Sequence, residues 1–359
     1  MKIVIGIFVS FYPYMHATEN KLAIIVSDEQ YIKHTCMHWT DKAVIAIEPL
    51  RGGRGGSRLY AVNFEQGEPC VVRLLVSPSF AREKSWQEAE IAAMQSASQA
   101  GVGPHIFAAH IKDNEHEMGY VVMQKINSIM PQEIPWNNPI TYTQLGELLK
   151  KMHAQPSVIF VDEEAFYRRA GIQINVLKKK WQELGIEGLP QQIEKVRIFF
   201  EQSKIKLIPH SRTHLMHGDL IGRNLLYDGV RFWAVDWEHS RVTANPLFDL
   251  ALVQDCFVPH EYHTDFMRGY YGQNTLPYDQ QETFTRVRIL ANCYVGMGFA
   301  RIKPKEFVDL FLKFEKSKID VAQALHFLMH GGYTGDDKDI ARCAALFFMQ
   351  GYKLLKEVY

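Results

Sequence analysis

The sequence predicts an α+β fold in two lobes: a small N-terminal lobe with an antiparallel sheet and one main helix, and a larger, mostly helical C-terminal lobe. Short runs rich in β-branched and aromatic residues, separated by turn residues, are concentrated before residue 126. Apolar residues at helical spacing dominate after residue 140. The length of 359 residues exceeds one typical small domain and suits two lobes, each with a sizeable core.

Composition and charge are those of an ordinary soluble globular protein, with 47% hydrophobic and 22% charged residues. Lysine plus arginine and aspartate plus glutamate both number 40, so there is no electrostatic reason to expect nucleic acid or an anionic membrane as a partner. The five cysteines are scattered, with no Cys-x-x-Cys pair, which indicates a reducing compartment and no zinc site. We therefore expect a cytoplasmic protein, and the sequence leaves its oligomeric state open.

Residues 1–14 are an apolar extension whose status the sequence leaves open. Lys2 followed by an apolar run from Ile3 to Phe11 is typical of a short signal peptide, although no clear Ala-x-Ala-like cleavage site follows. The run is too short to span a bilayer. The alternatives are a strand-like extension of the fold and a translation start at Met15.

Three strands are predicted near the N-terminus, at residues 43–48, 59–62 and 70–75, with a glycine-rich run at residues 52–57 between the first two. Glycines let backbone amides approach a phosphate without a side chain in the way. Four residues of the run are therefore candidates for phosphate contact: Gly53, Gly55, Gly56 and Ser57. A plain flexible hairpin turn is the alternative interpretation.

A helix is predicted over residues 81–100, which contain no proline or glycine. Its inner stripe includes Trp86, Glu90 and Met94 at successive turns. An acid on an apolar stripe requires a partner, so Glu90 is favoured over Glu88, which would face elsewhere. The alternative is a solvated helix face.

A strand at residues 120–126 leads into a connector with three prolines, Pro131, Pro135 and Pro139, and this change in composition marks the boundary between the lobes. The predicted division is 15–126 for the first lobe and 127–359 for the second. Beyond it, Thr141-x-x-Gln144 is typical of a helix cap. Mostly helical patterns then cover residues 160–200, 260–288, 307–330 and 339–359.

The most informative segment contains His217-Gly218-Asp219, Asn224 and Asp236-Trp237-Glu238. The residues between Asn224 and Asp236 have the pattern of two short strands joined by a turn, and such a hairpin would hold the two ends close together. A phosphoryl-transfer site requires a group that positions an attacking hydroxyl and oxygen ligands that hold Mg²⁺. The two carboxylates and the amide provide these parts.

This ordered series, together with Asn245 and Phe248-Asp249-Leu250-Ala251, resembles the aminoglycoside phosphotransferase and choline kinase superfamily and is closest in pattern to choline and ethanolamine kinases. The resemblance implies a bilobal fold similar to that of the protein kinases, with a nucleotide-binding N-terminal lobe and a catalytic, substrate-binding C-terminal lobe. It implies ATP and Mg²⁺ as cofactors. It also implies that Asp249 braces the catalytic loop, and we expect His217 to bond the loop backbone.

The resemblance gives individual residues a role. Asp219 would orient the acceptor hydroxyl, and with an ordinary pKa near 4 positioning would outweigh proton abstraction. Asn224 and Asp236 would hold magnesium. Arg73 stands where many relatives have a lysine that holds the phosphates, and choline kinases tend to have arginine there, paired with Glu90. An exposed arginine without a ligand is the alternative. The connector residues expected to meet the adenine ring are Gln124, Lys125 and Ile126.

The acceptor that the resemblance implies is a small alcohol with an amino or ammonium group, choline or ethanolamine before thiamine or an aminoglycoside. Glu238 could supply the negative charge, and aromatic faces could supply cation–π attraction. The sequence does not choose among the candidate aromatics Tyr262, Tyr270, Tyr271, Phe327, Tyr333 and Tyr352. His239 stands where many choline kinases have tyrosine, which leaves the amine open. A non-catalytic nucleotide-binding regulatory protein is the alternative from another class, and the joint presence of Asp219, Asn224 and Asp236 argues against it.

Overall fold

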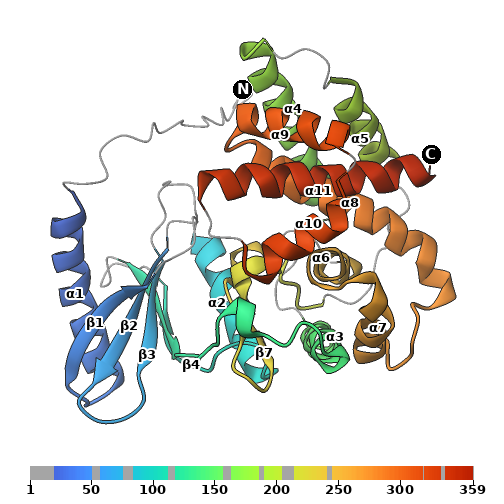
Figure 1. Cartoon of the computed structure of the whole chain (residues 1–359). Coiled ribbons are helices and arrows are strands. Elements are labelled where there is room, and N and C mark those ends of the chain that lie inside the picture. The colour runs from blue at the N-terminus through green and yellow to red at the C-terminus, as the bar shows by residue number, and fades with distance from the viewer. Residues whose placement is uncertain are drawn as a thin grey trace, which may run out of the picture.

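The computed structural model describes residues 20–50, 57–75, 84–111, 118–156, 163–185, 190–203, 214–240, 245–317, 319–332 and 336–358. Within these residues, the sheet and its two helices lie on one side of the molecule and most of the remaining helices lie on the other (Figure 1). The apolar residues 1–14 and three of the predicted phosphate contacts, Gly53, Gly55 and Gly56, lie outside the described residues.

The five strands of the main sheet pair in the order β1-β2-β3-β5-β4, and every pairing is antiparallel. They are β1 (Val44–Leu50), β2 (Arg58–Phe64), β3 (Cys70–Leu75), β4 (Ile106–His110) and β5 (Gly119–Gln124). The sequence predicted four of these strands, and β4 is the addition. Its pairing with β5 is irregular between Ile106 and Ala108, so it lacks the regular alternation by which strands are found.

Helices cover both faces of this sheet. On one face, α1 (Asn20–Trp39) packs Ile32 and Cys36 against side chains of β2, β3 and β5. On the other face, α2 (Lys84–Gln99) packs Met94 and Ala97 against Val71 of β3. Successive strand residues point to opposite faces, which explains why neighbouring residues of β3 belong to different cores. The first lobe therefore contains a second long helix, α1, beside the predicted main helix α2.

Two backbone hydrogen bonds hold a small hairpin of the second lobe, one from the hairpin to the first lobe and one from the connector to the hairpin. The hairpin consists of β6 (Leu225–Tyr227) and β7 (Phe232–Ala234), as predicted. Ala234 N–H donates to Val102 O, just beyond α2, at 2.8 Å, and Ile129 N–H donates to Tyr227 O at 2.9 Å. The hairpin that positions Asn224 and Asp236 is thus attached to the sheet lobe.

The remaining helices build the larger lobe: α3 (Pro139–His153), α4 (Glu163–Glu183), α5 (Pro190–Ser203), α6 (Leu247–Phe257), α7 (His263–Tyr271), α8 (Gln281–Ala300), α9 (Pro304–Ser317), α10 (Val321–Phe327) and α11 (Asp337–Val358). Short 3₁₀ turns lie at Pro131–Glu133, Gly222–Asn224, Trp237–His239, His260–Tyr262 and Tyr278–Gln280, and a π-helical turn lies at Leu328–Gly332. Helices α8 and α11 cross in close contact, because a Cβ on Gly296 would stand 2.6 Å from the backbone nitrogen of Phe348.

The predicted cap of α3 was wrong. The helix begins at Pro139, and its cap is Asn138, whose Oδ1 accepts a hydrogen bond from Ile140 N–H at 3.0 Å. The hydroxyl of Thr141 instead donates to Pro135 O at 2.8 Å. A proline at the first helical position explains the earlier start, since its missing N–H needs no partner there.

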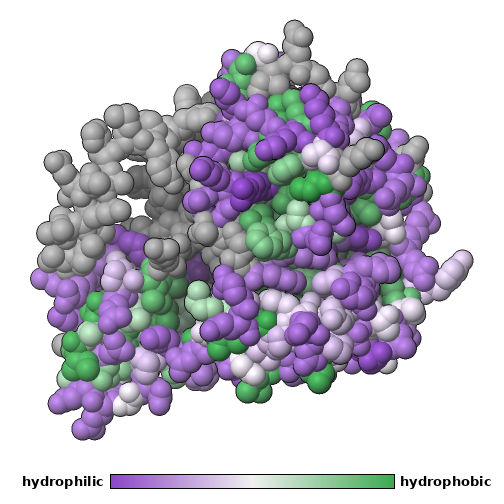
Figure 2. Space-filling view, in the orientation of Figure 1, coloured by the Kyte–Doolittle hydropathy of each residue, from purple (hydrophilic) through white to green (hydrophobic). Residues whose placement is uncertain are grey.

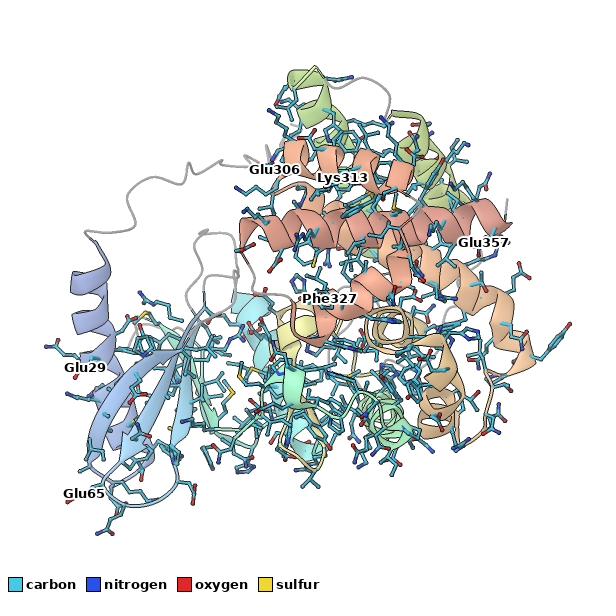
Figure 3. All side chains as sticks on the ribbon, in the orientation of Figure 1. Glu29, Glu65, Glu306, Lys313, Phe327 and Glu357 are labelled. Atoms are coloured by element: carbon cyan, nitrogen blue, oxygen red, sulfur yellow. The ribbon has the colours of Figure 1, made fainter. Side chains whose placement is uncertain are left out.

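The face of the larger lobe seen in Figure 2 is mainly hydrophilic, with hydrophobic residues in small groups. Figure 3 shows charged side chains at the surface of both lobes, among them Glu29 on α1 and Glu306 and Lys313 on α9. Of the helices in the described residues, none is both long enough and apolar enough to cross a bilayer.

Candidate active site

A buried carboxylate fixes the loop that carries Asp219. Asp249, in the first turn of α6, is fully buried and accepts hydrogen bonds from His217 N–H at 2.7 Å and Gly218 N–H at 2.8 Å. Desolvation raises the pKa of Asp249, but the hydrogen bond with His153 and the charges and donors around it lower that pKa by more. Asp249 therefore braces the loop as an ionised group.

His217 is part of the same support. Its Nε2 lies 2.9 Å from Val235 O, its Nδ1 accepts from Asp219 N–H at 3.3 Å, and its ring packs at a tilt against buried Trp237. Desolvation lowers the pKa of His217, so the ring is neutral and donates from Nε2. These contacts tie the loop to the end of β7.

Asp219 and Asn224 contact each other directly. The Asn224 amide nitrogen donates to Asp219 O at 2.8 Å and to Asp219 Oδ2 at 3.1 Å. Because the amide nitrogen makes both bonds, Asn224 Oδ1 is the atom left to face a cation. Val235 N–H donates to Asn224 O at 3.0 Å, which brings the residue before Asp236 against Asn224, as the predicted hairpin requires.

Asp236 has φ +69°, and no other non-glycine residue in the described ranges has a positive φ. Aspartate tolerates this left-handed conformation better than most residues, and such strained positions cluster at functional sites. Asp236 Oδ1 accepts from Arg73 Nη2 at 2.9 Å. The structure thus brings the predicted metal ligand to the predicted phosphate-binding arginine.

Arg73 connects three elements. Its Nη2 lies 2.6 Å from Glu90 Oε1 of α2, so the ion pair predicted between these residues is present. Desolvation lowers the pKa of Arg73, but the charges of Glu90 and Asp236 raise that pKa by more, and the guanidinium stays charged. Within the described residues, the buried Arg73 Nε has no hydrogen-bond partner. An anionic ligand oxygen would satisfy it.

The donors around Asp236 fit a hard cation that shares its ligands with a nucleotide. The Asp236 carboxylate and the Asn224 amide line the same cavities, and such a cation takes further oxygens from phosphates and water. Across the described ranges, no three His, Cys, Asp or Glu side chains form a group that could hold a metal ion by themselves. The arrangement therefore suits Mg²⁺ bound together with phosphates.

Two cavities meet at this point. The larger, of about 650 Å³, lies between the lobes and is lined by Leu50, Leu59, Arg73, residues 124–128, Asn224 and Asp236, among others. The smaller, of about 270 Å³, is lined by Gln173, Asp219, Asn224, Asp236, Glu238, His239, Tyr294 and Phe299, among others. Asn224 and Asp236 line both cavities. Of the predicted glycine-run contacts, only Ser57 is described, directly before β2, and it lines neither cavity.

The smaller cavity has an acidic side with strongly shifted pKa values. Desolvation, and then the charges of Asp236 and Glu238, raise the pKa of Asp219 to about 7, against the opposing effects of His239 and Asn224. The ordinary value near 4 assumed from sequence therefore does not hold, and proton transfer to Asp219 is easier than expected. Desolvation lowers the pKa of His239, but the hydrogen bond with Glu238 and the nearby carboxylates raise it to about 9.

Sequence reasoning missed the far wall of this cavity. Tyr294 and Phe299 come from α8 and Gln173 from α4, and their only signal in the sequence was helical spacing. None of the five described aromatics proposed from sequence lines either cavity. Tyr262 stacks on Tyr142, and Phe327 is 77% exposed at the surface (Figure 3). Tyr333 lies outside the described residues.

A two-lobed fold with these residues in its cleft defines a kinase-like phosphotransferase. Residues 46–281 match the phosphotransferase enzyme family, and this match covers more than half of the chain, so the chain belongs to that family. It is a phosphotransferase of the kinase type. No curated protein matches the chain significantly.

Solved structures share the fold at low sequence identity. A choline/ethanolamine kinase family protein from Mesorhizobium loti is 18% identical with a TM-score of 0.54, over 92% of this chain and 99% of that one. A spectinomycin phosphotransferase crystallised with ADP and spectinomycin is 13% identical with a TM-score of 0.53, over 88% and 97%. A Plasmodium vivax ethanolamine kinase is 13% identical with a TM-score of 0.50, over 82% and 87%. At these identities the likeness establishes the fold alone.

Proposed function

We propose that this phosphotransferase uses Mg²⁺ and ATP to phosphorylate the hydroxyl of a small amino alcohol, with ethanolamine or choline as the leading acceptors. The observation that carries the proposal is the pair of cavities that meet at Asn224 and Asp236, with Asp219 in the smaller one. A nucleotide in one cavity and an alcohol in the other would meet at the residues suited to hold the cation. That arrangement is what in-line phosphoryl transfer requires.

The larger cavity has the groups that a nucleotide needs. Arg73 Nε is available for a phosphate oxygen. Gln124, Lys125 and Ile126 line the cavity, and in the described part of the chain no backbone hydrogen bond engages Lys125 or Ile126, so their amides and carbonyls are available to an adenine edge. The glycine-rich run with Ser57 remains our proposal for phosphate contact, since the flanking Leu50 and Leu59 line the same cavity.

In the proposed reaction, the acceptor oxygen attacks the γ-phosphorus, and the bond from that phosphorus to the bridging oxygen of ATP breaks to release ADP. Asp219 orients the hydroxyl and takes its proton, which its raised pKa of about 7 favours. Asn224 and Asp236 would hold Mg²⁺, which neutralises phosphate charge when bound. Arg73, supported by Glu90, would hold the phosphates.

The smaller cavity supports a small cationic acceptor. Its volume of about 270 Å³ is below the roughly 300–1,000 Å³ of cavities that take drug-sized ligands, which disfavours an aminoglycoside and, less strongly, thiamine. Glu238, with an 11% exposed side chain, supplies negative charge, which His239 at 3.4 Å and Arg301 in the same cavity partly offset. Tyr294 and Phe299 also line the cavity, and aromatic rings attract cations that lie over their faces.

A substrate panel tests the proposal. The protein is incubated with ATP, Mg²⁺ and, separately, ethanolamine, choline, thiamine and kanamycin, and ADP release is followed. We expect turnover with ethanolamine or choline that is lost in Asp219→Asn. Nucleotide binding without turnover on any compound would instead favour a regulatory nucleotide-binding protein.

A further inference from the structure

Gln173 of α4 is a buried polar side chain without a complete set of partners. It is 8% exposed, it lines the smaller cavity, and its Oε1 has no hydrogen-bond partner within the described residues. A buried acceptor oxygen left unpaired costs about 1–3 kcal/mol, so a donor is expected at this atom, and a ligand in the cavity is one source of it. Because Gln173 lines the cavity of Asp219, the ligand considered for this oxygen is the acceptor alcohol.

Gly298 of α8 borders the side-chain amide of Gln173. Gly298 of α8 lines the same cavity, and a Cβ there would stand 3.7 Å from Gln173 Nε2. Any side chain larger than alanine at this position would enter the space beside the amide. At this position α8 therefore places no side chain beside Gln173.

Glu238 and the aromatic rings attract any ammonium group, whether or not it carries N–H bonds. A hydrogen bond to Gln173 Oε1 depends on an N–H. A quaternary ammonium has none, so it would bury the oxygen without satisfying it. Sites built to hydrogen-bond a substrate group discriminate strongly against analogues that lack the group.

We infer that Gln173 is a specificity-determining residue that accepts a hydrogen bond from the ammonium N–H of the acceptor, so that the enzyme prefers amino alcohols with N–H bonds to quaternary ones. The inference rests on the proposed function and deepens it. It favours ethanolamine over choline as the acceptor, a choice that the sequence resemblance leaves open.

The test is the N-methylation series of ethanolamine, N-methylethanolamine, N,N-dimethylethanolamine and choline, with kcat and KM measured for each. All four are cations at neutral pH, and only choline lacks an N–H. We expect kcat/KM to fall at least tenfold at the last methylation, mainly through KM, because the lost contact is a binding contact.

Three variants complete the design. Gln173→Met removes the acceptor oxygen at similar size, and it should raise KM for the three N–H substrates while leaving choline unchanged. Gln173→Glu keeps an acceptor and should keep the preference. Gln182→Met, an exposed position on the same helix, is the matched control and should change nothing. The melting temperature of Gln173→Met should not fall, because the variant removes an unsatisfied polar atom.

Choline turnover equal to that of ethanolamine, or an equal loss on all four substrates in Gln173→Met, would overturn the inference while the proposed function stands. Absence of turnover on the whole series by an enzyme that still binds ADP would reject the acceptor class, and the inference with it.

Discussion

Replacing Asp249 by asparagine should destabilise the protein by about 3–5 kcal/mol. Asp249 is fully buried, and its two oxygens accept from the backbone N–H groups of His217 and Gly218, with His153 Nε2 at 3.4 Å. Charge-assisted hydrogen bonds contribute about 1.5–3 kcal/mol each. Asparagine keeps one acceptor oxygen but turns an amide donor toward a backbone donor, which loses one bond and leaves a buried N–H unsatisfied.

The measurement is urea unfolding of Asp249→Asn beside the wild type. Asp228→Asn is the matched control, since Asp228 accepts from Val230 N–H, Arg231 N–H and Trp233 Nε1 in a turn that water reaches. The control should cost about 1 kcal/mol or less, because water can replace the lost bonds. A loss below about 1 kcal/mol in Asp249→Asn itself would refute the reasoning that this carboxylate braces the loop.

The stability lost in Asp249→Asn should depend on pH. The pKa of Asp249 is lower in the folded protein than its ordinary value of 3.8, so its stabilisation is fully present above that value. It is lost as the pH falls through the folded pKa, when the carboxylate becomes protonated. The stability difference between wild type and Asp249→Asn should therefore be constant from pH 5 to pH 7 and shrink below about pH 4.

Three further substitutions separate the roles proposed for the site. Asp219→Asn should lower kcat by about 10²–10⁴-fold and leave the Kd for ATP within about twofold, and a large change in that Kd would mean its role is different. Asparagine tolerates the left-handed backbone, so Asp236→Asn should keep the fold and weaken nucleotide binding about tenfold in the presence of Mg²⁺. Binding of metal-free ADP, measured by calorimetry, should not change. Equal effects in both conditions would remove Asp236 from the metal site. Glu90→Gln removes the 2.6 Å ion pair with Arg73 and should raise KM for ATP about tenfold, with an unchanged KM indicating that Arg73 does not need the pair.

Features that depend on local sequence were predictable. Strands β2, β3 and β5, the β6–β7 hairpin and helix α2 follow from short-range patterns. The acid on the stripe of α2 required a partner, which identified Glu90. Strand β4 was missed because its pairing is irregular and its residues are mostly half-buried, so no alternating pattern marks it.

The smaller cavity was not predictable, because it forms only when distant elements pack together. Gln173 and Tyr294 lie more than a hundred residues apart, on α4 and α8, and each has the ordinary helical spacing of a core residue. The resemblance to choline kinases drew attention to aromatics near the C-terminus, but sequence spacing does not show which rings face a cavity. The raised pKa of Asp219 likewise depends on burial beside Asp236 and Glu238, which only the fold reveals.

The contacts of Arg73 explain how the two lobes form one site. Arg73 Nη2 contacts Glu90 from the sheet lobe and Asp236 from the larger lobe, and Ala234, two residues before Asp236, donates to Val102 beyond α2. Asp236 therefore owes its position to both lobes, and a shift between them would separate the proposed metal ligand from the arginine proposed to hold the phosphates. A ligand that contacts Arg73 and Asp236 together is bound by the assembled cleft and not by either lobe alone. Since binding to the folded state alone stabilises it, Mg-ATP should stabilise the joint between the lobes as well as occupy the cleft.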